Sequence, residues 1–466
     1  MTRARQLLVA ALAAAALAIT AAPTSPPSAD PGTFTWQKMF GAETVPLTDG
    51  TINVIKVVGD DIYVGGDFTN FAGIATADRI ARWVGARQVW EGLAAFSAPD
   101  GGAAREGSIT AGSVNAIEVS GNTIFVGGNF TVTTVDSEIH HNLAWFTIPD
   151  QRVNGYWQYD WHGFPGNGVH DDAVWNGQVN AILAYNNDLY VGGSFTNGYD
   201  SDNNDYLMLG RFSLCYTSEV SACSYTPPDV TVCGGVLVTC AVNPPNFWVP
   251  AGINELSGGP SLNNFVSSIA EDPDYGVLVT GNFISAGTGI GPNYLARFTD
   301  DGFWYSQGIS TGTMYPTAVL NGELYAAGWE GAYRRTGFDA WEAMCHSSLV
   351  ISSTHWKTIT PISSSQVILA STGGISVCNP TTGAAIQLST NPGVVASAMY
   401  NGDLIVAGDT RVGNLVGTGD SIARGVDVTN LPATNGDTRH GTDSIILMIT
   451  LAALTALAGT QLLRRA

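Results

Sequence analysis

The sequence is poor in basic residues. Lys and Arg together number 19 against 39 Asp and Glu, which gives a formal net charge of −20. Binding to nucleic acid depends on clustered Lys and Arg that neutralise phosphates, so this balance argues against a nucleic-acid partner. An acidic surface mainly keeps a protein soluble.

The sequence gives little support for catalysis. Seven His occur, and none has a metal-binding spacing such as H-E-x-x-H. No G-x-S-x-G nucleophile elbow, which requires that motif between a strand and a helix, is apparent, and neither is a phosphate-binding loop. These observations assign no catalytic residue.

Charged residues make up only 12% of the chain, whereas Gly is abundant at 55 residues. Short runs of β-branched and aromatic residues alternate with turn-forming residues along most of the sequence. This composition predicts an all-β protein of many short strands, with almost no helix outside the termini.

One short segment recurs along the chain. The sequence I-Y-V-G-G-D-F at residues 62–68 returns with small changes at 124–130 and 189–195, and more loosely at 277–283. Self-similarity of this kind is typical of repeat architectures, which often exceed the usual domain length as a single unit.

Each copy of the repeat reads as four consecutive strand-like pieces separated by turn formers. Seven copies can be traced, and the third contains a Cys-rich insertion at residues 214–264. The last copy lacks a fourth strand, while the strand-like residues 33–39 have no adjacent partner. We therefore expect a β-propeller over residues 33–428, with seven four-stranded blades and closure by the N-terminal strand; six or eight blades are the alternatives, because the later copies are weak.

The pattern V-N-A-I, then L-Y-V-G-G-x-F, then I-A-R-W resembles kelch-like and galactose-oxidase-central-domain-like propeller repeats of secreted bacterial proteins. The resemblance covers about residues 33–425, is good in the first three copies and fades in the fifth and sixth. It implies the propeller scaffold only, because no copper ligands or Tyr-Cys cofactor can be carried over.

The repeated residues have a packing explanation. A strand covered on both faces by neighbouring blades is apolar on both faces. Paired glycines allow a neighbouring backbone to approach where a Cβ would clash. We expect the repeated Tyr, Gly and Phe residues to be structural, so that function lies in segments that do not repeat.

Both ends of the chain have the composition of targeting segments. Residues 1–22 combine early Arg residues with an apolar run, as in a secretory signal peptide, and a Pro-rich spacer follows at 23–32. At the other end, an apolar run at 445–463 is long enough to cross a membrane as a helix and precedes two Arg residues.

Residues 431–466 resemble the LPxTG cell-wall sorting signal. The residues that carry the resemblance are Leu431, Pro432, Thr434, Asn435 and Gly436. The family implies that a sortase-type transpeptidase cuts after the Thr and links it to the cell envelope. Asn435 departs from the usual Gly, so the alternative is an ordinary C-terminal membrane anchor.

Export makes the six cysteines candidates for disulfides. The simplest pairing joins Cys345 to Cys378 and keeps the other four within their own segment, with three possible connectivities. Those four are Cys215, Cys223, Cys233 and Cys240.

Two segments outside the repeat suggest ligands. Aromatic, acidic and His residues gather between 156 and 175, a combination suited to sugars, although the favoured alternative is that the tryptophans cover the outer blade strand and the loop. They are Trp157, Trp161, His162, His170, Asp171, Asp172 and Trp175. The oxygen ligands Asp200, Asp202 and Asn204 alternate as in calcium loops, without the full EF-hand pattern. Calcium is the only cofactor this suggests, and a plain polar turn is the alternative.

The sequence therefore favours a cell-surface propeller, exported and anchored in the envelope, that acts as a binding or adhesion module for an extracellular glycan or protein. The insertion at 214–264 is a candidate specificity element. The alternatives are a secreted carbohydrate-active enzyme, such as a glycosidase or lyase with carboxylates at a channel mouth, and a structural envelope protein.

Overall fold

The computed structural model describes the chain between residues 35 and 426, with gaps. The described residues are 35–40, 47–48, 50–93, 108–133, 139–148, 159, 161–163, 177–186, 188–195, 208–215, 231–233, 249–250, 262, 264–284, 294–299, 304–307, 314–329, 331–345, 356–390 and 392–426. Strands dominate these residues, and two 3-10 turns, η1 (Phe71–Gly73) and η3 (Thr410–Leu415), are their helical segments.

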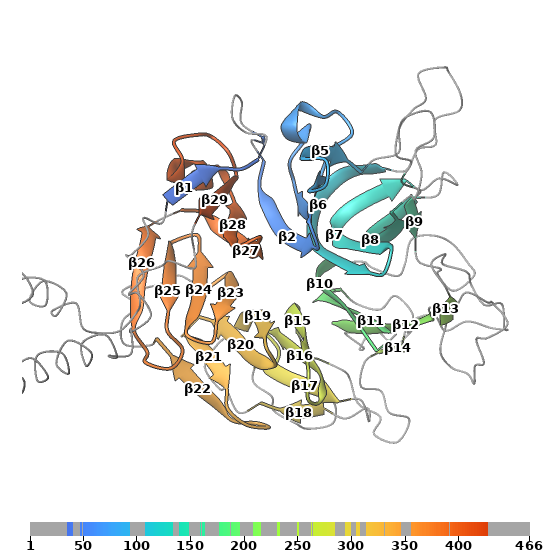
Figure 1. Ribbon diagram of the computed structural model, residues 1–466. Helices are drawn as coiled ribbons and strands as arrows, with labels where there is room; N and C mark the ends of the chain where they lie inside the picture. The colour runs from blue at the N-terminus through green and yellow to red at the C-terminus, as the bar shows by residue number, and fades with distance from the viewer. Residues whose placement is uncertain are drawn as a thin grey trace, which may run out of the picture.

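Six sheets are formed by strands that are consecutive in the chain, and they follow one another around a ring (Figure 1). The first two sheets comprise β2 (Ile52–Val58), β3 (Asp61–Gly66), β4 (Ile80–Val84) and β5 (Val89–Gly92), then β6 (Ser108–Ser120), β7 (Thr123–Thr133), β8 (Ile139–Thr147) and β9 (Trp161–Gly163). The third comprises β10 (Gln178–Tyr185), β11 (Asp188–Ser194), β12 (Leu209–Cys215), β13 (Thr231–Cys233) and β14 (Val249–Pro250).

The next three sheets each have four strands in simple up-and-down order. They are β15 (Val266–Asp272), β16 (Gly276–Gly281), β17 (Leu295–Thr299) and β18 (Trp304–Ser306); β19 (Met314–Leu320), β20 (Glu323–Gly328), β21 (Ala332–Arg335) and β22 (Trp341–Met344); and β23 (Thr358–Ser363), β24 (Gln366–Ser371), β25 (Gly374–Cys378) and β26 (Ala385–Thr390).

The ring is closed by a composite sheet that joins the two ends of the chain. It contains β27 (Val394–Tyr400), β28 (Asp403–Gly408) and β29 (Ile422–Val426), followed by the N-terminal β1 (Thr35–Lys38). β1 pairs with β29 in antiparallel register, from Thr35 opposite Val426 to Lys38 opposite Ala423. The strand predicted at 33–39 thus takes the position predicted for it.

The all-β propeller prediction is confirmed, with a difference in regularity. In place of seven equivalent four-stranded blades, six blades are built from consecutive strands and the closing sheet is composite. The third blade has a fifth strand, because β13, which lies within the Cys-rich insertion, pairs parallel to the end of β12 while β14 pairs antiparallel to its start.

The first strands of the sheets line the centre of the ring. Each contacts the first strand of the next sheet, and β27 contacts β2. In the first three blades this strand carries a β-bulge at the Asn of the V-N-A pattern or its equivalent, namely Asn53, Asn115 and Asn180. A bulge redirects a side chain out of the regular alternation.

Each bulged Asn is directed toward the next blade. Its Nδ2 donates to a backbone carbonyl oxygen in the first strand of the next blade. The acceptor is the Val that comes just before the bulge in that strand. The acceptors are Val114, Val179 and Val266, at 3.3, 3.5 and 2.8 Å. The repeated Asn therefore links neighbouring inner strands, which explains why it recurs.

The paired glycines serve two different close contacts. A Cβ at the first glycine of each pair would lie 2.4 Å from the Cγ1 of a Val in the next blade, as Gly127 does with Val179. A Cβ at the second would collide with a backbone carbonyl of the same blade, as Gly128 does with Ser113 O at 2.1 Å. The repeated glycines are therefore explained by packing, as predicted.

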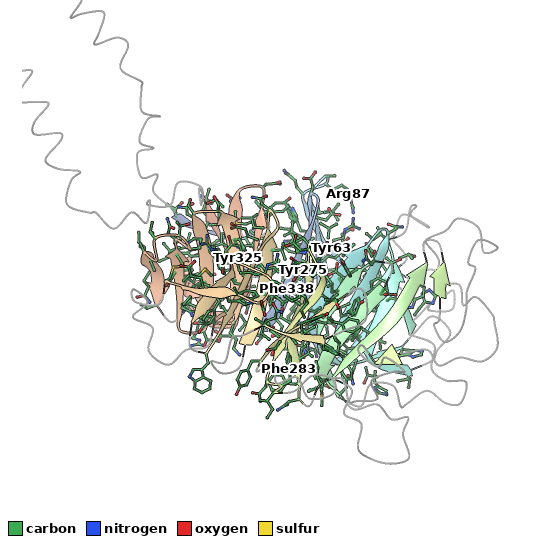
Figure 2. The ribbon with its side chains drawn as sticks, turned by 90° about the horizontal axis from the view of Figure 1, so that it is seen from below. Tyr63, Arg87, Tyr275, Phe283, Tyr325 and Phe338 are labelled. Carbon is green, nitrogen blue, oxygen red and sulfur yellow. A yellow bond between two sulfur atoms is a disulfide. The ribbon has the colours of Figure 1, made fainter. Side chains whose placement is uncertain are left out.

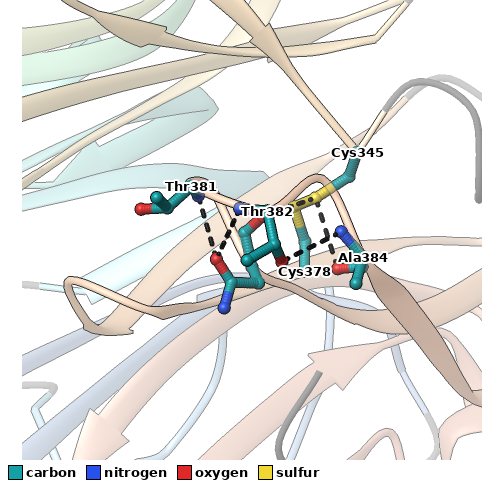
Figure 3. The surroundings of a disulfide bond; sticks show 6 residues. Cys345, Cys378, Thr381, Thr382 and Ala384 are labelled. Carbon is teal, nitrogen blue, oxygen red and sulfur yellow. Dashed lines mark hydrogen bonds between the residues drawn. A yellow bond between two sulfur atoms is a disulfide. The ribbon is translucent and has the colours of Figure 1, made fainter. Parts of the chain in front are cut away.

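A disulfide joins the fifth and sixth blades. Cys345 follows β22, Cys378 ends β25, and their Cα atoms are 6.0 Å apart. The bridge lies against the turn after β25, where Asn379 Oδ1 accepts hydrogen bonds from the backbone N–H groups of Thr381 and Thr382 at 2.9 and 3.0 Å (Figure 3). The predicted pairing of these two cysteines is confirmed.

Only two of the remaining cysteines fall among the described residues. Cys215 and Cys233 are register partners in the parallel pair of β12 and β13. Cys223 and Cys240 lie outside the described residues, so the connectivity of this group stays a prediction.

We expect the double substitution Cys345→Ala with Cys378→Ala to lower the free energy of unfolding. The bridge closes a loop with a sequence separation of 33. A loop of this size predicts a loss of about 3–4 kcal/mol, measured by urea denaturation. A non-reducing peptide map is the direct check, because a digest without a peptide linking positions 345 and 378 would rule the pairing out.

The substitution Gly128→Ala should destabilise the propeller by about 1–3 kcal/mol, because its Cβ meets a backbone carbonyl that side-chain rotation cannot move. Gly419→Ala is the matched control, since a Cβ there meets no heavy atom within 4 Å. Thermal unfolding of both variants checks this, and equal shifts in Tm would contradict the packing explanation.

Candidate functional site

The propeller presents two faces that differ in the chain segments they carry. We call the face where β29 ends and β1 begins the terminus face; the turns from first to second strands lie there too. The opposite face, where second strands end, we call the distal face. Figure 2 shows the disc from its side, with Arg87 of the terminus face and Phe283 of the distal face at opposite edges.

The most exposed large apolar side chains lie on the distal face. Trp329, Ile284 and Ile139 are 61%, 54% and 51% exposed, whereas the other large exposed apolar residues reach only 41%. Ile284 and Trp329 follow the second strands of two adjacent blades, β16 and β20. Apolar side chains that a soluble fold leaves this exposed are candidates for contact with a partner.

Trp329 marks a departure from the repeat that sequence reasoning missed. The residue after the second glycine is polar in the other clear copies, as in Asp67, Asn129 and Asn282. In the fifth blade Trp329 occupies this place after Gly328. A comparison of the copies position by position would have found it.

The structure corrects the prediction for Trp161, which belongs to the core. Its side chain is fully buried, its Nε1 donates to Leu93 O at 2.9 Å, and its ring packs on Phe146 at 4.6 Å between centroids. The residue lies on β9, whose alternation turns this ring inward. A sugar cannot stack on a ring with no exposed face.

Of the other residues predicted between 156 and 175, His162 is described. Its ring stacks on Trp145 with centroids 4.3 Å apart. The rest lie outside the described residues, as do the calcium candidates and the sorting signal, so those predictions stay predictions. They are Trp157, His170, Asp171, Asp172, Trp175, Asp200, Asp202, Asn204, Leu431, Pro432, Thr434, Asn435 and Gly436.

The described residues were compared with two further predictions, a metal site and a membrane helix. No group of three or more His, Cys, Asp or Glu side chains that could hold a metal ion occurs among them. Nor does this part of the chain contain a helix long and apolar enough to cross a membrane, and the predicted helix 445–463 lies outside it.

One ion pair crosses between the inner strands of the first two blades. Lys56 Nζ lies 2.7 Å from Glu118 Oε2, and the Glu118 side chain is largely buried. Burial raises the pKa of the Glu118 carboxyl, and the neighbouring Lys56 ammonium opposes that shift. The pair adds an electrostatic link to the Asn53 contact at the same junction.

The Arg of the I-A-R pattern, on the third strand of a blade, forms a second group of ion pairs. In the first blade Arg82 donates through Nε and Nη2 to Asp61. In the closing sheet Arg424 donates through Nη1 to Asp403 at 3.2 Å and through Nη2 to Gln37 at 2.7 Å. Both arginines thus use Nη groups in hydrogen bonds.

The corresponding Arg297 of the fourth blade has a different environment. Its side chain is fully buried, and its Nε lies 2.6 Å from Asp272 Oδ2. Its Nη1 and Nη2 are buried and have no hydrogen-bond partner among the residues that the structure describes. Burial lowers the pKa of this guanidinium, although the Asp272 carboxylate counteracts the effect.

Aromatic rings enclose this guanidinium on the terminus face. Its Cζ lies 4.6 Å from the Tyr275 ring centroid and 4.4 Å from that of Phe338 in the fifth blade. The two rings meet edge to face at 4.8 Å, and Figure 2 shows them side by side. Such contacts favour the charged guanidinium.

Arg335 of the fifth blade also pairs with the carboxylates at this junction. Its Nη1 lies 2.6 Å from Asp272 Oδ1, and its Nη2 pairs with Asp274. Two guanidinium groups and two carboxylates therefore share this junction, and both oxygens of Asp272 are occupied. We call Asp272, Tyr275, Arg297, Arg335 and Phe338 the Arg297 cluster.

Comparisons with known proteins find solved structures of low similarity. No protein-family model and no curated protein matches it. YCF48 from Cyanidioschyzon merolae shares 10% identity at a TM-score of 0.44, over 84% of this chain and 98% of that chain. YCF48 bound to D1 peptide shares 12% at 0.43, over 84% and 94%.

The computationally designed Ika8 protein is similar at 9% identity and a TM-score of 0.38, over 77% of this chain and 81% of that chain. At these levels of similarity the propeller assignment depends on the strand pairing of this chain itself, and nothing about its ligand follows.

Proposed function

We propose that this protein is an exported, surface-anchored β-propeller that binds an extracellular ligand through its distal face. In this proposal the closing sheet counts as the seventh blade, and the segment at Leu431–Gly436 is the sortase-type sorting signal. The observation that carries it is the placement of Trp329 and Ile284, more than half exposed, on adjacent blades.

The positions of the chain ends support this orientation. Thr35 and Val426, the described ends of the propeller, are register partners at the terminus face. A chain anchored after Val426 therefore leaves from that face, so the distal face is the one directed away from the envelope. A ligand in the surroundings would reach the exposed side chains of that face first.

The chemistry of the exposed side chains favours a glycan or a protein ligand over an ion. An exposed indole offers a flat apolar face for sugar rings and a polar N–H at its edge, and tryptophan is common at the energetic centres of protein interfaces. The ligand contact proposed here is apolar at Trp329 and Ile284.

We expect Trp329→Ala to weaken ligand binding at least about tenfold, since truncation of an anchoring Trp typically costs 2 kcal/mol or more. A glycan array, followed by titration of the strongest hit, measures this effect. Val89→Ala on the terminus face is the matched control, because Val89 is also an exposed apolar residue. An equal response of both variants would refute the distal-face assignment.

The anchor has a separate test. Thr434→Ala should release the protein from the detergent-insoluble cell-wall fraction, because the residue that corresponds to the sortase cleavage site would no longer be recognised. Immunoblots of wall, membrane and culture fractions measure the distribution. Retention in the wall fraction at the wild-type level would exclude sortase linkage, while a shift to the membrane fraction is the expected result.

A further inference from the structure

The Arg297 cluster differs from the other third-strand arginines at one residue of the second strand. In the first blade and in the closing sheet, the second strand begins with the carboxylate that pairs with the arginine, Asp61 or Asp403. In the fourth blade the second strand begins with Gly276. The acceptor that the repeat usually provides for the Nη groups is absent from that position.

The turn before β16 explains why no carboxylate stands at the start of this strand. Val58 pairs with Asp61 and Tyr400 with Asp403 across two-residue turns, whereas Asp272 pairs with Gly276 across three residues. Gly276 has φ 129°, a backbone conformation that side chains disfavour, so an Asp is not tolerated there. The additional residue brings Tyr275 over the guanidinium.

Asp272 replaces the missing carboxylate only in part. It accepts from the Nε of Arg297, while its second oxygen accepts from Arg335. The edge of Arg297 formed by Nη1 and Nη2 is left without an acceptor in the described residues. Leaving buried charged donors unsatisfied costs free energy, and a carboxylate matches this edge through two parallel hydrogen bonds.

Two aromatic rings, those of Tyr275 and Phe338, lie beside this edge of Arg297. Tyr275 and Phe338 are each 39% exposed, although they cover a fully buried guanidinium. Both lie in turns, Tyr275 before β16 and Phe338 after β21, so a ligand would reach the edge only after one of these side chains changes its rotamer. Exposed aromatic faces suit the apolar face of a sugar ring.

We propose that the Arg297 cluster is a binding site for a carboxylated saccharide of the uronic acid type. The sugar carboxylate accepts hydrogen bonds from Nη1 and Nη2 of Arg297, and the sugar ring stacks on Tyr275 or Phe338. Arg335 and Asp272 hold the guanidinium in place. This site lies on the terminus face, so it is distinct from the distal face and does not depend on the function proposed above.

The test is a titration of the full chain with sodium D-glucuronate, followed by saturation-transfer NMR, with D-glucose, acetate and acetyl-Gly-Gly as comparison ligands at equal ionic strength. Glucuronate should bind, glucose should show no saturable binding, and acetate and the peptide carboxylate should each bind at least about tenfold more weakly because they lack the stacked ring. The Trp329→Ala variant should bind glucuronate as the wild type does.

Three variants assign the contact. Arg297→Lys keeps the charge but removes the paired donors, so it should weaken glucuronate binding at least about tenfold. Phe338→Ala and Tyr275→Ala, at partly exposed turn positions, should each weaken it about twofold to tenfold. Arg82→Lys, the same change at the same repeat position, should leave the affinity unchanged.

Each contrary result overturns the proposal in a defined way. Equal binding of glucose and glucuronate would exclude a role for the carboxylate. Tighter binding of acetyl-Gly-Gly would assign the site to peptide C-termini, and equal binding of acetate would make it a simple anion site. If Arg297→Lys fails to fold, unchanged affinity in both Phe338→Ala and Tyr275→Ala would still refute the assignment.

Discussion

The close approach of neighbouring inner strands is the constraint on which the rest of the structure depends. Each inner strand must pack against the next while its own backbone groups stay paired, and the bulged Asn side chains and the glycines without Cβ make this possible. Larger side chains at these glycines would push the sheets apart. The blades can therefore vary in loops and outer strands, but the inner ring tolerates little change.

This constraint weakens where the repeat changes. In the fourth blade Ser267 stands at the bulge where the earlier blades have Asn, and its hydroxyl is buried without a hydrogen-bond partner among the described residues. The link to the fifth blade passes instead through Ser268 and Thr317, whose hydroxyls lie 2.7 Å apart. The junction between these blades is also where the Arg297 cluster lies, so charged contacts coincide with a weaker inner link.

The fold could be predicted from the sequence because the residues that determine blade packing recur in each copy of the repeat. The glycine pairs, the V-N-A segments and the unpaired strand at 33–39 each reflect local packing that recurs around the ring, and the structure confirms the propeller. For Trp161 the sugar-binding interpretation was wrong and the alternative, that it packs on the blade, is right, because the composition of a segment does not reveal which way a strand turns its side chains. Its burial depends on contacts with Leu93, just after β5, and with Phe146 in β8.

Arg297 and Trp329 were missed for a related reason. Both stand at repeat positions, and what distinguishes them is a neighbour that fails to match, Gly276 in one case and the lost polar residue after Gly328 in the other. Their signal is a difference between copies, which becomes visible only when the copies are aligned by strand register. The partner residues Tyr275 and Phe338 come from turns of two different blades, and no local pattern links them.

The pairing of β1 with β29 has a mechanical consequence. β29 is held between β28 and β1, and Val426 is its last residue. Tension between a ligand on the distal face and an attachment beyond Val426 would act along the strands, at right angles to their hydrogen bonds. All the bonds of both ladders then share the load at once in shear, and none can be peeled away singly. If the chain is anchored in this way, the N-terminal strand would hold in place the strand that carries the tension.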